Sequence, residues 1–143
     1  MGVNAKMTEY EFIEEIDDNF IFDSDEEYAE AARVGAAISD NAALMVGYEL
    51  AKGGSLATQE TNLALLDILA GARPTPVVLA AIPVVKALLE GQPAGKESVA
   101  LLLTACKEHT SAWSGLGIVL CADDSLEAEV EAVMEKYRAA NGA

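Results

Sequence analysis

The chain has 143 residues, 52% of them hydrophobic, and its 24 acidic residues outnumber 9 Lys and Arg, which gives a formal net charge of −15. This length and apolar content predict a single globular domain over residues 1–143 and exclude an intrinsically disordered chain. The charge argues against sites that bind nucleic-acid phosphates or anionic lipid, because both need clustered Lys and Arg. We therefore expect no nucleic acid and no membrane among its partners.

The N-terminal part is the most acidic region, and it carries two helix-start signals. The first 31 residues hold eleven Asp and Glu but a single base, Lys6, so two thirds of the net charge lies there. The stretches from Thr8 to Glu11 and from Ser24 to Glu27 have the pattern of capping boxes, in which a hydroxyl and a carboxylate satisfy free backbone amides. They predict one helix ending near Asp18 and a second running toward Ile38, within an acidic segment over residues 8–31.

The rest of the chain divides into helical segments at Gly and Pro. Breaks are marked by Gly53 with Gly54, by residues 71–76 and by residues 91–95. Between them, apolar residues recur at helical spacing, and Ala and Leu dominate over β-branched and aromatic residues. We expect helices over residues 42–52, 58–70, 75–90, 96–108 and 125–140, and a short piece around residues 112–120 that Gly115 and Gly117 weaken.

The predicted fold class is therefore all-α, a compact bundle of six or seven short helices. A weak internal similarity at an offset of 36 residues relates the sequence Leu63-Ala64-Leu65-Leu66 to Val99-Ala100-Leu101-Leu102. Two-helix repeats of about this length build α-solenoids. Stacked helical hairpins are the alternative to the bundle.

Three large apolar residues, Phe20, Ile21 and Phe22, lie between the first two predicted helices with carboxylates on both sides. The acidic run does not match a calcium-binding loop, because Tyr28 and Val34 stand where that loop needs Gly and a bidentate Glu. The apolar residues are either a core plug between two helices or aromatic anchors inside a polar recognition surface. In the second hypothesis, the partner-binding residues are Asp17, Asp18, Phe20, Phe22, Asp23, Asp25, Glu26 and Glu27.

Residues that could support catalysis or metal binding are few. His109 is the single histidine, and Cys106 and Cys121 are the two cysteines. Cys106 and His109 share a helical face, but the paired spacing of a zinc site is absent. We expect both thiols to be unligated and buried, and we expect Trp113 to be structural. No enzyme motif is present, so we predict a protein that is not an enzyme and holds no cofactor or metal.

The charge distribution predicts a binding function. A negative patch speeds association with a positive partner and loses strength as salt rises. We expect a small cytoplasmic protein that docks a basic protein partner through its acidic N-terminal face, as an inhibitor or immunity-type protein does. An acidic coat that serves only solubility is the competing explanation.

Two other functions stay open. In the first, the protein is a self-assembling scaffold, and the apolar helix over residues 77–89 supplies a homodimer interface. In the second, it is a small ligand-binding protein that uses Cys106, His109 and Trp113.

Overall fold

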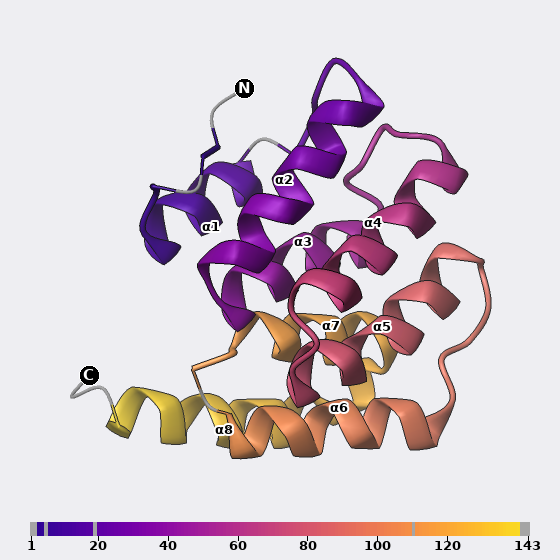
Figure 1. The fold of residues 1–143 in the computed structure, drawn as a ribbon. Helices are drawn as coiled ribbons and strands as arrows, with labels where there is room; N and C mark the ends of the chain where they lie inside the picture. The colour runs from indigo at the N-terminus through magenta and orange to yellow at the C-terminus, as the bar shows by residue number, and fades with distance from the viewer. Residues whose placement is uncertain (1–2, 5, 19, 110, 141–143) are drawn as a thin grey trace.

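The structure is a computed structural model that describes residues 3–4, 6–18, 20–109 and 111–140, and these residues form an all-α protein, as predicted (Figure 1). The helices in chain order are α1 (Glu9–Asp18), α2 (Asp25–Ile38), α3 (Asp40–Lys52), α4 (Gln59–Ala72), α5 (Pro76–Leu89), α6 (Lys96–Glu108), α7 (Ser114–Ala122), the 3-10 helix η1 (Asp124–Leu126) and α8 (Glu127–Ala140). Within the described residues there are thus eight α-helices, one more than the upper end of the expected range. The additional helix arises because the short segment that Gly115 and Gly117 weaken still completes a helix, α7.

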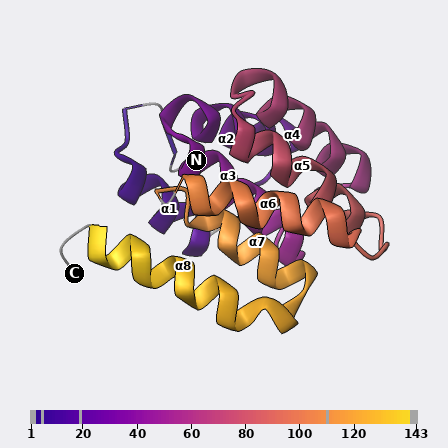
Figure 2. The ribbon, with the colours of Figure 1, turned by 90° about the horizontal axis from the view of Figure 1, so that it is seen from below.

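The central helix of the bundle is α3, which contacts α1, α2, α4, α5 and α7. Seen from below in Figure 2, α7 lies between α6 and α8, and it contacts both of them. In a solenoid each repeat contacts only its neighbours along the chain. Because α3 also packs against α7, which is distant in sequence, the described residues form a compact bundle instead of stacked hairpins.

The predicted capping box of α1 is confirmed. The backbone N–H of Thr8 donates to Oε1 of Glu11 at 2.9 Å, and the backbone N–H of Glu11 donates to Oγ1 of Thr8 at 3.1 Å. The hydrogen bonds from Thr8, with the backbone one contributing most, lower the pKa of Glu11. At the start of α2, Oγ of Ser24 accepts a hydrogen bond from the backbone N–H of Glu27 at 3.3 Å.

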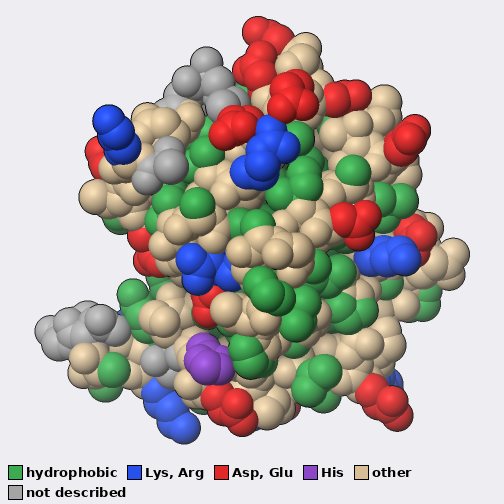
Figure 3. All heavy atoms as spheres, viewed as in Figure 1, with side chains coloured by type: hydrophobic (Ala, Val, Ile, Leu, Met, Phe, Trp, Pro, Cys, Tyr) green, Lys and Arg blue, Asp and Glu red, His purple; other side chains and the backbone are tan. Residues whose placement is uncertain are grey.

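Acidic side chains gather at the N-terminal end of α2, at the top of the face shown in Figure 3. Asp25, Glu26 and Glu27 occupy the first turn of this helix, where the positive end of the helix dipole favours negative charge. Glu26 also lies 2.7 Å from Nη2 of Arg33, which is 2.9 Å from Glu30. Part of the acidic N-terminal segment therefore has a local structural explanation.

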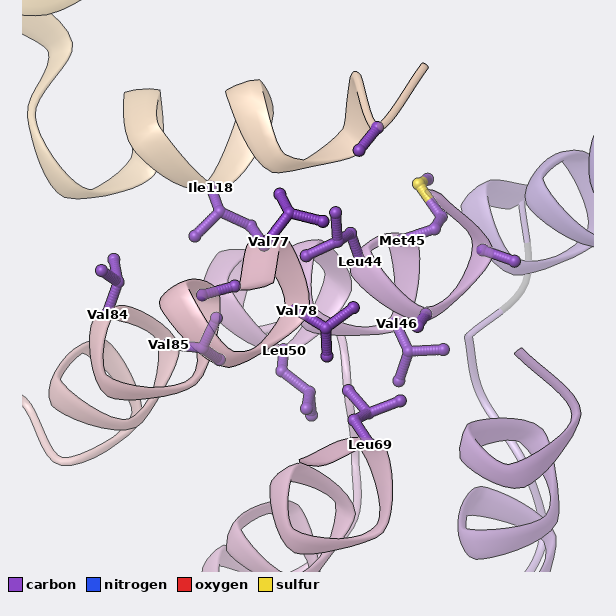
Figure 4. Packing of buried hydrophobic residues seen from close by; sticks show 14 of the residues in the cluster. Leu44, Met45, Val46, Leu50, Leu69, Val77, Val78, Val84, Val85 and Ile118 are labelled. Atoms are coloured by element: carbon purple, nitrogen blue, oxygen red, sulfur yellow. The ribbon is translucent and has the colours of Figure 1, made fainter. Parts of the chain in front are cut away.

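The apolar sequence over residues 77–89 is explained by burial inside the chain itself. It forms α5, which contacts α3, α4, α6 and α7, and Figure 4 shows its valines meeting side chains of α3, α4 and α7. Val77, Val78, Val84 and Val85 are all buried in this core. These valines are therefore not available to a subunit interface, which corrects that part of the scaffold hypothesis.

Candidate functional site

The aromatic part of the predicted recognition segment folds inward. Phe20 is only 3% exposed, and its ring meets Tyr28 edge-to-face with centroids 5.3 Å apart. Phe22 is half-buried and meets Tyr28 in the same way at 5.0 Å. The hydroxyl of Tyr28 donates to the carbonyl of Phe20 at 3.4 Å and accepts from the backbone N–H of Phe22 at 3.3 Å and of Leu56 at 3.1 Å. Phe20 is therefore not accessible to a partner, and its burial agrees with the core-plug hypothesis.

The predicted acidic residues separate into two groups. Asp17 and Asp18 are exposed on the last turn of α1. Asp23, Asp25, Glu26 and Glu27 lie in the approach to α2 and in its first turn, where Glu27 is half-buried and the others are exposed. Among these predicted acidic residues, Asp17 lines a depression of the surface.

This depression, which we call the α1/α8 groove, has a volume of about 330 Å³ and lies between α1 and α8 over a floor from α3 and α7. Its apolar lining includes Ile13, Met45, Tyr48, Trp113, Leu116 and Met134. An adjoining hollow of about 460 Å³ shares Ile13, Asp17 and Trp113 with it and adds Tyr10 and Tyr137. The two hollows therefore form one continuous depression along α1.

Two local features shape the floor of the groove. Gly117 in α7 faces the ring of Tyr48, and a Cβ at this position would lie 2.8 Å from Cε1 of that ring. The backbone N–H of Ser114 donates to the buried Oδ1 of Asn41 at 2.7 Å, which ties the start of α7 to α3. This contact places the preceding residue, Trp113, at the point where the two hollows meet.

The rim of the groove is negatively charged. Its two hollows are lined by four carboxylates, Glu9, Glu14, Asp17 and Glu131, and by one guanidinium, that of Arg138, which gives a balance of −3. Arg138 lies 3.2 Å from Glu131 and also pairs with Glu135. Its positive charge is therefore already engaged by carboxylates of its own helix.

Lys52, which contacts Asp17 of this rim, is engaged as well. Nζ of Lys52 lies 2.8 Å from Oε2 of Glu49 and 4.4 Å from the centroid of the Tyr48 ring, but 3.8 Å from Asp17. Burial raises the pKa of the Glu49 carboxyl, although the charge of Lys52 opposes this shift. Lys52 therefore lies closer to the buried carboxylate of Glu49 than to Asp17 at the rim.

No family model matches this chain, and comparison with curated proteins and with solved structures found no significant match. The residues that the structure describes contain no group of three or more His, Cys, Asp and Glu side chains that could hold a metal ion. Among the described helices, none has the length and hydropathy needed to cross a bilayer. The interpretation of the site therefore rests on the geometry and charge of the groove.

The two cysteines and the histidine have different environments. Cys106 is buried, and its Sγ would lie 2.8 Å from a Cβ at Gly115. Cys121 is exposed on α7, which corrects the expectation that both thiols are buried, and His109 is exposed after the end of α6. Burial raises the pKa of Cys106 to about 12.

We expect the two thiols to react very differently with an aromatic disulfide reagent at about pH 8. Burial raises the pKa of both thiols, and only the thiolate is nucleophilic, but Cys121 is exposed to the reagent whereas Cys106 is buried. The native protein should titrate one thiol, that of Cys121, and a second thiol should appear only in denaturant. Cys121→Ser should leave no fast-reacting thiol in the native protein. Two thiols that react at equal rates without denaturant would contradict the burial of Cys106.

Proposed function

We propose that this protein is a binding domain that docks a basic protein partner in the α1/α8 groove. The observation that supports this function is the combination of an aromatic and methionine-rich lining with a rim of carboxylates. Protein interfaces have the same arrangement, with apolar anchors at the centre and polar groups around them. The net charge of −15 adds long-range attraction for a positive partner.

The occupant that fits this groove is a cationic amphipathic helix. The groove lies between two helices, and a third helix can pack its apolar side chains into such a groove. Its apolar face would cover Trp113 and Met134, while its Lys and Arg would meet Glu14 and Asp17. If this helix belongs to a basic enzyme, its capture would block that surface. The proposed role is therefore of the inhibitor or immunity type.

The direct test uses the fluorescence of Trp113, which is the single tryptophan of the chain. The probe is a synthetic helical peptide of about 18 residues with Leu on one face and Lys on the other and without Trp. Binding should shift the emission of Trp113, and the affinity should fall several-fold between about 50 and about 200 mM salt. A peptide with Glu in place of Lys should not bind.

Two matched double variants distinguish an effect of carboxylates at the groove from an effect of the overall charge of the protein. Glu14→Gln with Asp17→Asn removes two charges at the groove, and Asp25→Asn with Glu26→Gln removes two charges at the start of α2. We expect the first pair to slow association about three- to tenfold and the second pair to slow it less than about twofold, with folding intact in both. Equal losses would mean that the acidic surface acts only through net charge. An unchanged Trp113 signal at saturating peptide would exclude the groove as the site.

A further inference from the structure

The larger of the two hollows along α1 is lined mainly by aromatic rings and carboxylates. It has a volume of about 460 Å³, and we call it the aromatic hollow. Its rings come from three separate segments, because Tyr10 lies in α1, Trp113 directly before α7 and Tyr137 in α8. Its charged groups are all carboxylates of α1, namely Glu9, Glu14 and Asp17. Rings and negative charge thus line the same concave surface.

The depression along α1 collects most of the tyrosine and tryptophan residues of the chain, which has four tyrosines and one tryptophan. Its two hollows are lined by Tyr10, Tyr48, Trp113 and Tyr137, whereas Tyr28 is buried beneath Phe20 and Phe22. Tyr10 is 75% exposed, and Trp113 and Tyr137 are half-buried. Core packing therefore accounts for Tyr28, but it leaves part of the other ring surfaces open to a ligand.

Aromatic rings combined with carboxylates favour a cation. The face of an aromatic ring carries partial negative charge and attracts a cation that lies over it. Tyr48, which lines the adjoining hollow, already makes such a contact, since Nζ of Lys52 lies 4.4 Å from its ring centroid. None of the described residues that line the aromatic hollow is Lys or Arg, so its charge balance is −3. A positive group that enters this hollow must therefore come from a ligand.

We propose that the aromatic hollow binds an organic cation with a methylated ammonium group. Tyr10, Trp113 and Tyr137 contact the methyl groups, and the carboxylates of Glu14 and Asp17 balance the charge. A quaternary ammonium group has no N–H and spreads its charge over its methyl groups, so aromatic rings replace its hydration well. The volume of about 460 Å³ lies within the range of small-molecule sites.

Other ligands fit the aromatic hollow less well. A metal ion needs several oxygen ligands that converge on one point, and the described carboxylates of the hollow form no such group. An anion would be repelled by the three carboxylates. An unmodified Lys ammonium is strongly hydrated and donates three hydrogen bonds, so it favours direct contact with a carboxylate over contact with rings.

A methylated ammonium group has two possible sources, a free small cation or a methylated lysine of a partner protein. The binding chemistry is the same for both. The site does not depend on the docking of a peptide, because a free cation needs only the hollow.

Titration of the isotope-labelled protein with choline chloride, which replaces NaCl at constant ionic strength, tests the site. The reporter is the indole N–H resonance of Trp113, the single tryptophan. We expect a saturable shift with a dissociation constant of about 10 mM or below. A neutral alcohol of the same shape, with a tert-butyl group in place of the trimethylammonium group, should bind at least about tenfold more weakly. No shift at about 100 mM choline, or equal binding of the two compounds, overturns the proposal.

Tyr10 provides a matched pair of variants, because it is 75% exposed and its replacement should leave the fold intact. Tyr10→Leu removes the ring and should raise the dissociation constant for choline at least about threefold, whereas Tyr10→Phe keeps the ring and should change it less than about twofold. Glu14→Gln should also weaken binding, but Glu26→Gln, at the start of α2, should not. Circular dichroism checks the folding of all four variants. Choline binding that Tyr10→Leu leaves unchanged overturns the proposal.

A peptide comparison identifies the source of the cation. The amphipathic Lys peptide is compared with the same peptide in which one central Lys is trimethylated. If the source is a partner side chain, trimethylation should tighten binding at least about threefold, and Tyr10→Leu should remove this gain. If the source is a free cation, choline binds and trimethylation changes nothing. Choline binding without peptide binding would reject the docking function and keep this site, and peptide binding without choline binding would do the reverse.

Discussion

Phe20→Ala should lower the free energy of unfolding by about 3–5 kcal/mol, as expected for the loss of a fully buried phenylalanine. The side chain is 3% exposed, and its ring meets both Phe22 and Tyr28 edge-to-face. Its removal leaves a cavity between the end of α1 and the start of α2. Phe22→Ala should cost less, at most about 2 kcal/mol, because the Phe22 side chain is half-buried. Urea unfolding followed by circular dichroism measures both values.

The neighbouring residue provides the control. Ile21 is 56% exposed, so Ile21→Ala should change stability by less than about 0.5 kcal/mol. Tyr28→Phe keeps the aromatic packing but removes the hydroxyl to which the backbone N–H groups of Phe22 and Leu56 donate. This substitution should lower the free energy of unfolding by about 1–3 kcal/mol. If Phe20→Ala is no more destabilising than Ile21→Ala, this segment is not a core plug.

The fold class and most helix ends could be predicted because their signals are local. The capping box at Thr8 needs four consecutive residues, and Gly53, with φ of 80°, ends α3 through a conformation that glycine adopts freely. The helical spacing of apolar residues over 125–140 likewise corresponds to α8, in which Val130 and Val133 are buried. Each of these features is decided within one or two helical turns.

The groove could not be predicted because four helices from distant parts of the chain build it. The sequence predicts a structural role for Trp113, and it contains no signal that marks Tyr10, which is 75% exposed, as part of a site. Met134 lies one turn after Val130 on the same side of α8, yet it is half-buried and lines the groove. Periodicity identifies the apolar face of a helix, but it does not tell how completely the neighbouring helices cover that face.

The division of the acidic segment also depends on tertiary structure. In the sequence, Asp17 and Asp25 belong to one continuous run of acids. In the structure, Asp17 lines a groove with side chains of α3, α7 and α8, whereas Asp25 stabilises the start of its own helix. Charge along a chain therefore indicates the sign of a partner, and the fold selects which carboxylates can meet it.

Gly35→Ala should lower the free energy of unfolding by about 1–3 kcal/mol, although Ala favours a helix over Gly by about 1 kcal/mol. A Cβ at this position of α2 would lie 2.9 Å from Cζ of Phe12 and 3.2 Å from the carbonyl oxygen of Ala42. The Phe12 ring is fully buried, and the carbonyl belongs to the backbone of α3, so neither can move at low cost. Thermal and urea unfolding measure the loss.

Gly71→Ala is the matched control for this substitution. Gly71 also lies in a helix, α4, but no atom stands within 4 Å of a Cβ there, so the change should raise stability by about 0.5–1 kcal/mol. In a Phe12→Leu background, the smaller side chain gives the new methyl group room, and the cost of Gly35→Ala should shrink by at least about 0.5 kcal/mol. An undiminished cost in that background would assign the strain to the backbone of Ala42 instead of the Phe12 ring. If Gly35→Ala stabilises the protein as Gly71→Ala does, then α1, α2 and α3 do not meet at Gly35 as closely as the structure has them.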